Sequence, residues 1–162
     1  MVAISTYKTF WEYIRTVVPG INQVYVVHEE FDIAAIIKDI ADADVILLAV
    51  VPSSDTEASS SDDIKEFDSC FMFVVKKIDR SNLTHDEFLQ QWEMTQAIMG
   101  DVKDKMIELA GDYEHCQNPG TYGHLMHRLV IGGMHTDPEY NLHGCLGYGL
   151  SFRLRTIGTQ YP

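Results

Sequence analysis

The chain contains 162 residues, of which 46% are hydrophobic, and its formal net charge at pH 7 is −12. This length suits a single domain over residues 1–162 with a hydrophobic core of its own. An acidic chain without a basic stripe is a poor candidate for direct sequence-specific nucleic-acid binding, because neutralisation of phosphates supplies most of that affinity.

No run of about 18 apolar residues occurs, so a membrane-spanning helix is not expected. The first ten residues lack the charged and apolar segments of a secretory signal, which favours an intracellular protein. The three cysteines, Cys70, Cys116 and Cys145, show no paired spacing, and we interpret them as reduced thiols in apolar surroundings.

The first forty residues contain three short predicted elements. Residues 6–18 have the apolar spacing of an amphipathic helix, capped by Ser5 or Thr6, and residues 22–28 favour a strand. Residues 31–40 have helical spacing, although their isoleucines leave a strand possible. The apolar side of the first helix is expected to contain Phe10, Ile14, Val17 and Val18, with Trp11 beside it.

Two strands are predicted in the middle of the chain. Residues 44–51 form a continuous apolar run, which is typical of a strand covered on both faces, and residues 69–78 form a second such run. Residues 53–63 between them are rich in serine and acids and predict a mobile loop that joins two antiparallel strands.

The most regular stretch is a predicted helix from Thr84 to Gly111. Thr84 and Glu87 have the spacing of a capping box, and Gly111 is expected to end the helix in a left-handed conformation. One stripe of the helix should face the core. It consists of Phe88, Trp92, Thr95, Met99, Val102, Met106 and Leu109.

The C-terminal part predicts a second hairpin. Residues 124–135 alternate weakly and predict a strand, residues 136–141 predict its connection, and the last strand has a clear period of two. One face of the last strand should contain Leu146, Tyr148, Leu150, Phe152 and Leu154, and the other Cys145, Gly147, Gly149, Ser151, Arg153 and Arg155. The fold class is therefore α+β: an antiparallel sheet of about four strands against a long helix and a short N-terminal helix, in the order α-(α)-β-β-α-β-β.

Histidines near the predicted C-terminal hairpin suggest one possible metal site. His135, His143 and Cys145 would approach one another if residues 124–135 and 145–155 paired. His124 and His127 would lie on opposite faces of the predicted strand. No established catalytic or phosphate-binding motif occurs, so we expect no enzyme activity and no cofactor.

The glycine-bearing face of the last strand is a candidate contact surface. Gly147 and Gly149 leave room for another backbone, and this pattern fits either subunit packing or strand twist within the chain. Together with Arg153 and Arg155 they are the candidate oligomer contacts. Most acids lie before residue 112, which permits one acidic face and one near-neutral face and suits subunits that pack side by side.

The layout resembles that of small phage tail-completion or tail-terminator (neck) proteins. The segments that carry the resemblance are TYKTFWEYIRTVVPGI, DVILLAVVPSSD, DSCFMFVVKKIDRS, THDEFLQQWEMTQAIMGDVKDKMIEL and EYNLHGCLGYGLSFRLRT. The closing segment departs from the pattern, since Cys145 follows Gly144 where an aromatic residue is common, and Gly147 and Gly149 are added.

The resemblance implies a non-enzymatic structural subunit of the virion, made in the host cytoplasm and assembled as a homo-oligomeric ring with other tail or neck proteins. Residues 53–63 and the hairpin near 136–144 would be its contact elements. The alternative is a metal-binding domain or metal-assisted enzyme that uses the C-terminal histidines. A third hypothesis is an adaptor that binds a host protein through its acidic face.

Overall fold

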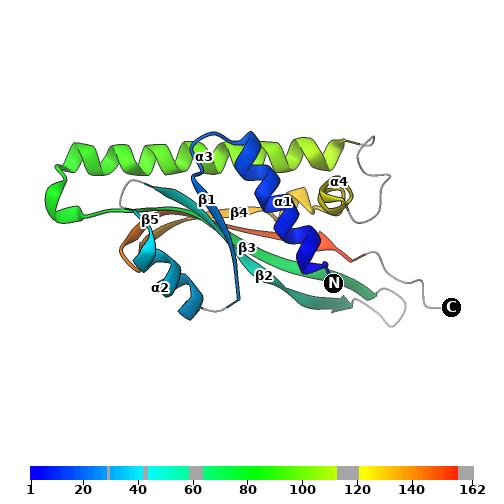
Figure 1. Cartoon of the computed structure of the whole chain (residues 1–162). Coiled ribbons are helices and arrows are strands. Elements are labelled where there is room, and N and C mark those ends of the chain that lie inside the picture. Colours follow the sequence, from blue (N-terminus) through cyan, green and yellow to red (C-terminus); the bar gives the residue numbers. More distant parts are fainter. Residues whose placement is uncertain (29, 42–43, 59–63, 113–120, 157–162) are drawn as a thin grey trace.

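A computed structural model describes residues 1–28, 30–41, 44–58, 64–112 and 121–156, and Figure 1 shows their arrangement. The larger helices are α1 (Ile4–Val17), α2 (Glu30–Asp39), α3 (His85–Gly111) and α4 (Tyr122–Met126). Short 3₁₀ turns span Arg80–Asn82 and Ile131–Gly133. The strands are β1 (Gln23–Val27), β2 (Val45–Ala58), β3 (Ile64–Lys77), β4 (His135–Leu142) and β5 (Cys145–Arg155).

The five strands form one mixed sheet in the order β1-β2-β3-β5-β4. β1 pairs with β2 in parallel, and all other neighbours are antiparallel. The α+β class is thereby confirmed in its broad form, with mixed helices and strands and one long helix. The predicted count of about four strands and the purely antiparallel sheet are wrong, because residues 23–27 join the sheet as a parallel edge strand.

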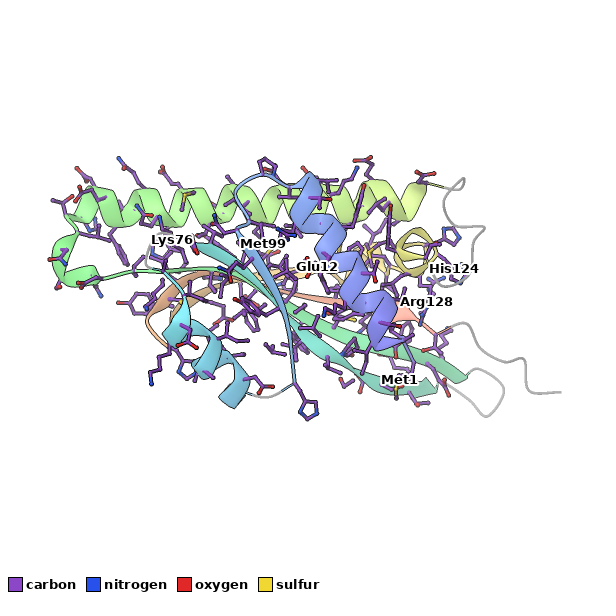
Figure 2. The ribbon with its side chains drawn as sticks, viewed as in Figure 1. Met1, Glu12, Lys76, Met99, His124 and Arg128 are labelled. Carbon is purple, nitrogen blue, oxygen red and sulfur yellow. The ribbon has the colours of Figure 1, made fainter. Side chains whose placement is uncertain are left out.

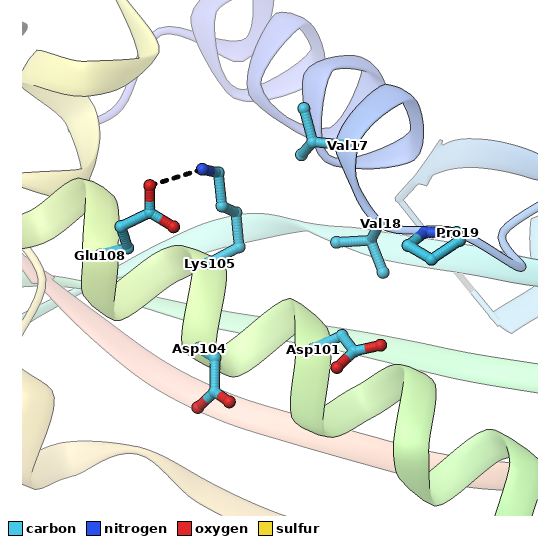
Figure 3. Close-up of a pocket in the computed structure, with 7 residues that line it drawn as sticks. All are labelled: Val17, Val18, Pro19, Asp101, Asp104, Lys105 and Glu108. Atoms are coloured by element: carbon cyan, nitrogen blue, oxygen red, sulfur yellow. Dashed lines mark hydrogen bonds and ion pairs between the residues drawn. The ribbon is translucent and has the colours of Figure 1, made fainter.

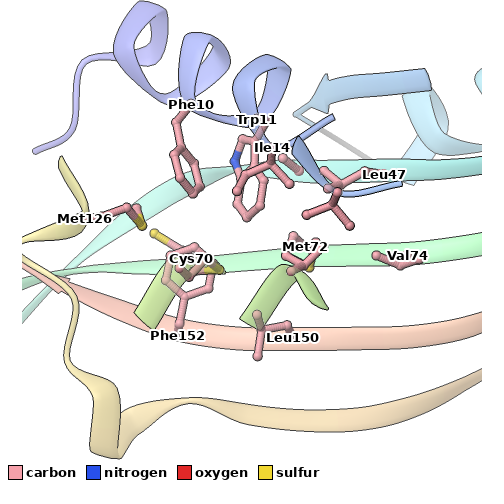
Figure 4. Packing of buried hydrophobic residues seen from close by; sticks show 14 of the residues in the cluster. Phe10, Trp11, Ile14, Leu47, Cys70, Met72, Val74, Met126, Leu150 and Phe152 are labelled. Carbon is pink, nitrogen blue, oxygen red and sulfur yellow. The ribbon is translucent and has the colours of Figure 1, made fainter. Parts of the chain in front are cut away.

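Helices α1, α3 and α4 cover one face of the sheet (Figure 1). The core beneath α1 is aromatic. The Trp11 ring lies edge-on against the ring of Phe10 in the same helix, at a centroid distance of 4.7 Å, and against the ring of Phe152 on β5, at 6.1 Å. Cys70 and Met72 of β3 complete this layer (Figure 4). A large, tightly packed apolar layer of this kind is the main source of stability for a domain of this size.

Helix α2 covers part of the opposite face. Ile33 and Ile37 of α2, and Ile40 directly after it, are buried against Ile46 and Leu48 of β2. Because Val45 and Leu47 belong to the core on the first face, β2 is apolar on both sides, as the continuous run of residues 44–51 predicted. The helix predicted over residues 31–40 is confirmed.

Helix α1 places more aromatic surface in the core than its sequence pattern predicted. Tyr7 and Trp11 are completely buried, whereas Val17 is exposed, so the buried stripe is rotated from the predicted one. The N-cap residue is Ala3, which makes no side-chain capping bond, and the predicted cap at Ser5 or Thr6 is wrong.

The capping box of α3 is confirmed. The hydroxyl of Thr84 accepts a hydrogen bond from the backbone N–H of Glu87, and the Glu87 carboxylate accepts one from the Thr84 N–H at 2.8 Å. Residues from Thr95 to Leu109 in the predicted stripe are buried, but Phe88 and Trp92 are only half-buried. Gly111 is the last helical residue and has no positive φ, so its predicted left-handed stop is wrong.

Strands β2 and β3 extend much further than predicted. Their pairing continues past a bulge between Val50 and Ser53 to Ala58 and Ile64, so residues 53–58 are strand and not loop. Residues 53–57 are polar on both faces, which concealed the strand in the sequence. Residues 59–63 of the predicted loop lie outside the described residues.

The predicted C-terminal hairpin is displaced along the chain. Residues 122–126 are helical, because Thr121 caps α4 through its hydroxyl, and within the described chain Leu129 forms an isolated bridge to Leu154. Residues 136–141, predicted as a connection, belong to β4, where the turn-forming Pro138 is tolerated because β4 is an edge strand. The chain reverses at His143 and Gly144, which both have positive φ.

Candidate assembly surface

Part of the sheet face that carries α2 is not covered by any helix of the described chain (Figure 1). Strand pairing defines which residues share this face, because paired residues point to the same side. We call this region the open sheet face. Its residues are Ser53, Asp55 and Glu57 of β2, Phe67, Ser69 and Phe71 of β3, Ser151, Arg153 and Arg155 of β5, and His135 and Asp137 of β4.

Phe71 lies at the centre of the open sheet face. Its side chain is 48% exposed, although the preceding and following residues of β3, Cys70 and Met72, are buried in the core. Ser151 of β5 is its direct neighbour across the sheet. An exposed phenylalanine on an uncovered sheet is the kind of apolar surface that marks a protein contact.

Charged residues of both signs surround Phe71. Arg153 forms an ion pair with Glu57, and its guanidinium lies 5.7 Å from the ring centroid of Phe67. His135 lies 3.0 Å from the carboxylate of Asp137 on β4. The open sheet face therefore mixes acids and bases, in contrast to the net charge of −12 of the whole chain.

The two candidate glycines, which lie on the α2 side of β5, pack closely within the chain. A Cβ atom on Gly147 would lie 2.0 Å from the carbonyl oxygen of Val74 on the neighbouring strand β3. Above Gly149, the ring of Phe73 and the carboxylate of Glu139 occupy the space at 3.1 Å. The atoms that approach both glycines, backbone atoms at Gly147 and side-chain atoms at Gly149, belong to the same chain, and this favours a role within the chain over subunit packing.

The two candidate arginines are exposed at the end of β5. Arg155 pairs with Phe67, and its N–H donates to the carbonyl of Arg128 at 2.8 Å. Arg153 and Arg155 point to the same side of the sheet as Phe71. Both remain candidates for contact with a neighbouring subunit.

The structure does not bring the three metal-site candidates together. His135 begins β4 opposite Ser151, and His143 lies in the turn at the other end of that strand. The 8 residues of β4 span about 27 Å of extended chain. The expected pairing of residues 124–135 with 145–155 is limited to the bridge of Leu129 with Leu154 and to His135 opposite Ser151, and the described residues contain no group of three histidines, cysteines or acids that could hold a metal.

Cys145 has a structural role beneath α2. It is 1% exposed and packs with the isoleucines of that helix. Burial raises the pKa of its thiol to about 11, although the nearby Lys77 opposes the shift. A thiol with this pKa is a poor metal ligand and nucleophile near neutral pH.

A second feature is a cleft between α1 and α3, which we call the acidic notch (Figure 3). It has a volume of about 350 Å³. Its lining residues are Val17, Val18, Pro19, Asp101, Asp104, Lys105 and Glu108. Lys105 donates to Glu108 at 2.7 Å, and no ion pair of Asp101 or Asp104 occurs within the described residues.

A third feature, which we call the aromatic patch, consists of Arg80, Phe88, Trp92 and Tyr140. Trp92 and Tyr140 are stacked with ring centroids 6.4 Å apart, and Phe88 meets both edge-on. The Arg80 guanidinium lies 5.0 Å from the centre of the Phe88 ring and donates to the Tyr140 hydroxyl. The apolar spacing of the helix predicted that Phe88 and Trp92 face the core. The one feature of the sequence that indicated otherwise is that both residues lie in the first two turns of the helix.

The comparisons give no family for this chain. No protein-family model matches its sequence, and no match was found among curated proteins. Within the described part of the chain, no helix has both the length and the apolar character needed to cross a membrane. The surfaces described above are therefore the observations that bear on function.

Proposed function

We propose that the protein is a non-enzymatic structural subunit that assembles with copies of itself into a ring, in the setting of a phage tail or neck. The observation that carries this proposal is the open sheet face with Phe71 at its centre. A half-covered sheet with an exposed aromatic residue and balanced charges is suited to bury that face against another protein.

The resemblance of the sequence to tail-completion and tail-terminator proteins provides the biological setting of the proposal. The acidic charge of the chain is compatible with a ring through which DNA passes, because a negatively charged inner surface limits the adhesion of DNA. In this setting the protein would be found in the virion after synthesis in the host cytoplasm, and its partners would be other copies and other tail or neck proteins.

The first experiment measures the mass of the purified protein by light scattering over a range of concentrations, with negative-stain imaging of the largest species. The expected result is a discrete homo-oligomer with ring-shaped particles. A monomer at every concentration, alone and mixed with tail components, would contradict the proposal.

Phe71→Arg tests the role of the open sheet face. It places a charge at the centre of the proposed contact, and we expect the dissociation constant of the oligomer to rise by more than about tenfold. Ile4→Arg is the matched control, since Ile4 is 57% exposed on α1, which covers the opposite face of the sheet. An equal effect of both variants would show that the open sheet face has no special role.

A further inference from the structure

The aromatic patch and the acidic notch have complementary chemistry. The patch presents a guanidinium among three aromatic rings, and Tyr140 is 57% exposed. Tryptophan, tyrosine and arginine are the residues that most often dominate the binding energy of an interface. The notch presents carboxylates beside the exposed apolar side chain of Val17.

No acid in the described part of the chain neutralises the charge of Arg80. Among the described residues, no carboxylate lies within ion-pair distance of its guanidinium. The neighbouring Asp79 instead accepts hydrogen bonds from the Ser81 N–H at 3.0 Å and from Asn82 at 2.7 Å. The positive charge of Arg80 is thus available to an external carboxylate, while its ring contacts hold the guanidinium in place.

The notch carries an excess of negative charge. Asp101, Asp104 and Glu108 face a single base, Lys105, which is already paired with Glu108. Helix α1 ends at Val17 beside the notch, and the unpaired carbonyl groups of a helix C-terminus add negative potential. A cationic group with apolar surroundings, such as that of the aromatic patch, fits this environment.

The two surfaces cannot meet within one subunit, because the same helix carries both. Trp92 and Asp104 are separated by twelve residues of α3, or about 18 Å along its axis. A contact between them therefore requires a second copy of the chain. Contacts between two different patches repeat from subunit to subunit and close into a ring when the rotation permits.

We infer that the aromatic patch of one subunit docks into the acidic notch of the next, with Arg80 placed against Asp101 and Asp104. This inference rests on the proposed ring assembly and names one of its contacts. Stable interfaces bury about 1,200 Å² of surface or more, and the notch alone is too small to supply that area. This contact therefore forms part of a larger interface. It does not compete with the open sheet face, which lies on the opposite side of the sheet (Figure 1).

The test is a charge reversal on each surface. Arg80→Glu and Asp104→Arg should each raise the dissociation constant of the assembly by more than about tenfold, because each places like charges in contact. The double variant Arg80→Glu/Asp104→Arg, and an equal mixture of the two single variants, should recover assembly. Lys8→Glu and Asp39→Arg are matched controls on exposed helical positions outside both surfaces.

Each outcome of this test has a distinct meaning. If the wild-type protein assembles and the two single variants assemble equally well, the docking inference is overturned while the ring proposal stands. If both single variants fail but neither the double variant nor the mixture recovers, the pairing of these two surfaces is overturned. If the wild-type protein is a monomer, the ring proposal itself fails. Asp104 is exposed on a helix, so its variant stays informative even if Arg80→Glu impairs folding, which circular dichroism would report.

Discussion

Arg128 and Asp68 form an ion pair in which the guanidinium Nη2 lies 2.7 Å from the carboxylate Oδ2, although the Asp68 side chain is completely buried. Asp68 pairs with Leu154 and points from β3 toward the face covered by α1. Figure 2 shows Arg128 just after α4. The other carboxylate oxygen has no hydrogen-bond partner within the described chain, and the Met1 amino nitrogen lies 3.8 Å from it. The pair connects residues 60 positions apart in the sequence.

Removing only the arginine should strongly destabilise the fold. Arg128→Met leaves a buried carboxylate without its main counter-charge, and we expect the free energy of unfolding to fall by about 3–5 kcal/mol. Asp68→Leu together with Arg128→Met should recover most of this loss, since apolar residues can replace a buried ion pair at little cost. Urea unfolding followed by circular dichroism measures both. Equal stability of the single and the double variant would contradict a role for the charge pair.

Gly147 and Gly100 should respond oppositely to alanine. A Cβ atom at Gly147 would collide with the Val74 carbonyl oxygen, so Gly147→Ala should cost about 3 kcal/mol or prevent folding. At Gly100, within α3, an added Cβ atom would meet no neighbouring element within 4 Å, and Gly100→Ala should add about 0.5–1 kcal/mol through helix propensity. Thermal unfolding of both variants measures whether each substitution lowers or raises the stability of the protein. A tolerated Gly147→Ala would mean that strands β3 and β5 can separate slightly.

The elements that the sequence predicted correctly are those with strong local signals. The capping box of Thr84 and Glu87 and the apolar run of residues 44–51 were confirmed, because capping and burial leave short-range patterns. The edge strand at residues 23–27 was found as a strand, but its parallel pairing depends on contacts that no local pattern reveals. Polar residues 53–58 were missed as strand because pairing with β3, and not their own propensity, holds them in place.

The candidate sites were less predictable than the fold. The open sheet face exists because α2 covers only part of one face of the sheet, and this depends on tertiary packing. Arg153 and Arg155 were selected from the alternation of β5, and both lie on the open sheet face. His135 and His143 were expected to meet through a predicted hairpin, but the hairpin forms at other residues. The aromatic patch requires Arg80 and Tyr140, which are 60 residues apart, to meet.

The capping box should make the stability of the protein depend on pH. Hydrogen bonds from Thr84 lower the pKa of the Glu87 carboxyl in the folded state, so its contribution is present above the unfolded pKa of about 4.3 and is lost as pH falls through the lower folded value. Thr84→Ala should therefore cost about 1 kcal/mol at pH 7 and less at about pH 2.5. Thr9→Ala, which removes only a hydroxyl bond to the Ser5 carbonyl, is a control without a carboxylate. A cost of Thr84→Ala that is the same at both pH values would contradict the role of Glu87.

The two described cysteines should be unreactive until the protein unfolds. Burial raises the pKa of Cys145 to about 11, so only about one thiol in a thousand is ionised at pH 8. Burial, reinforced by the nearby Asp68, raises the pKa of Cys70 still further. Cys116 lies outside the described residues, and Cys116→Ser removes it from the measurement.

In that variant, iodoacetamide at pH 8 should add no label to the native protein within an hour and two labels in urea, as counted by intact mass. The physical reason is that alkylation requires both a thiolate and access, and the core provides neither. Rapid labelling of Cys145 alone would show that α2 opens from the sheet without global unfolding. Rapid labelling of Cys70 would instead indicate that α1 detaches, and this would contradict the close packing of Trp11 and Phe152 around it.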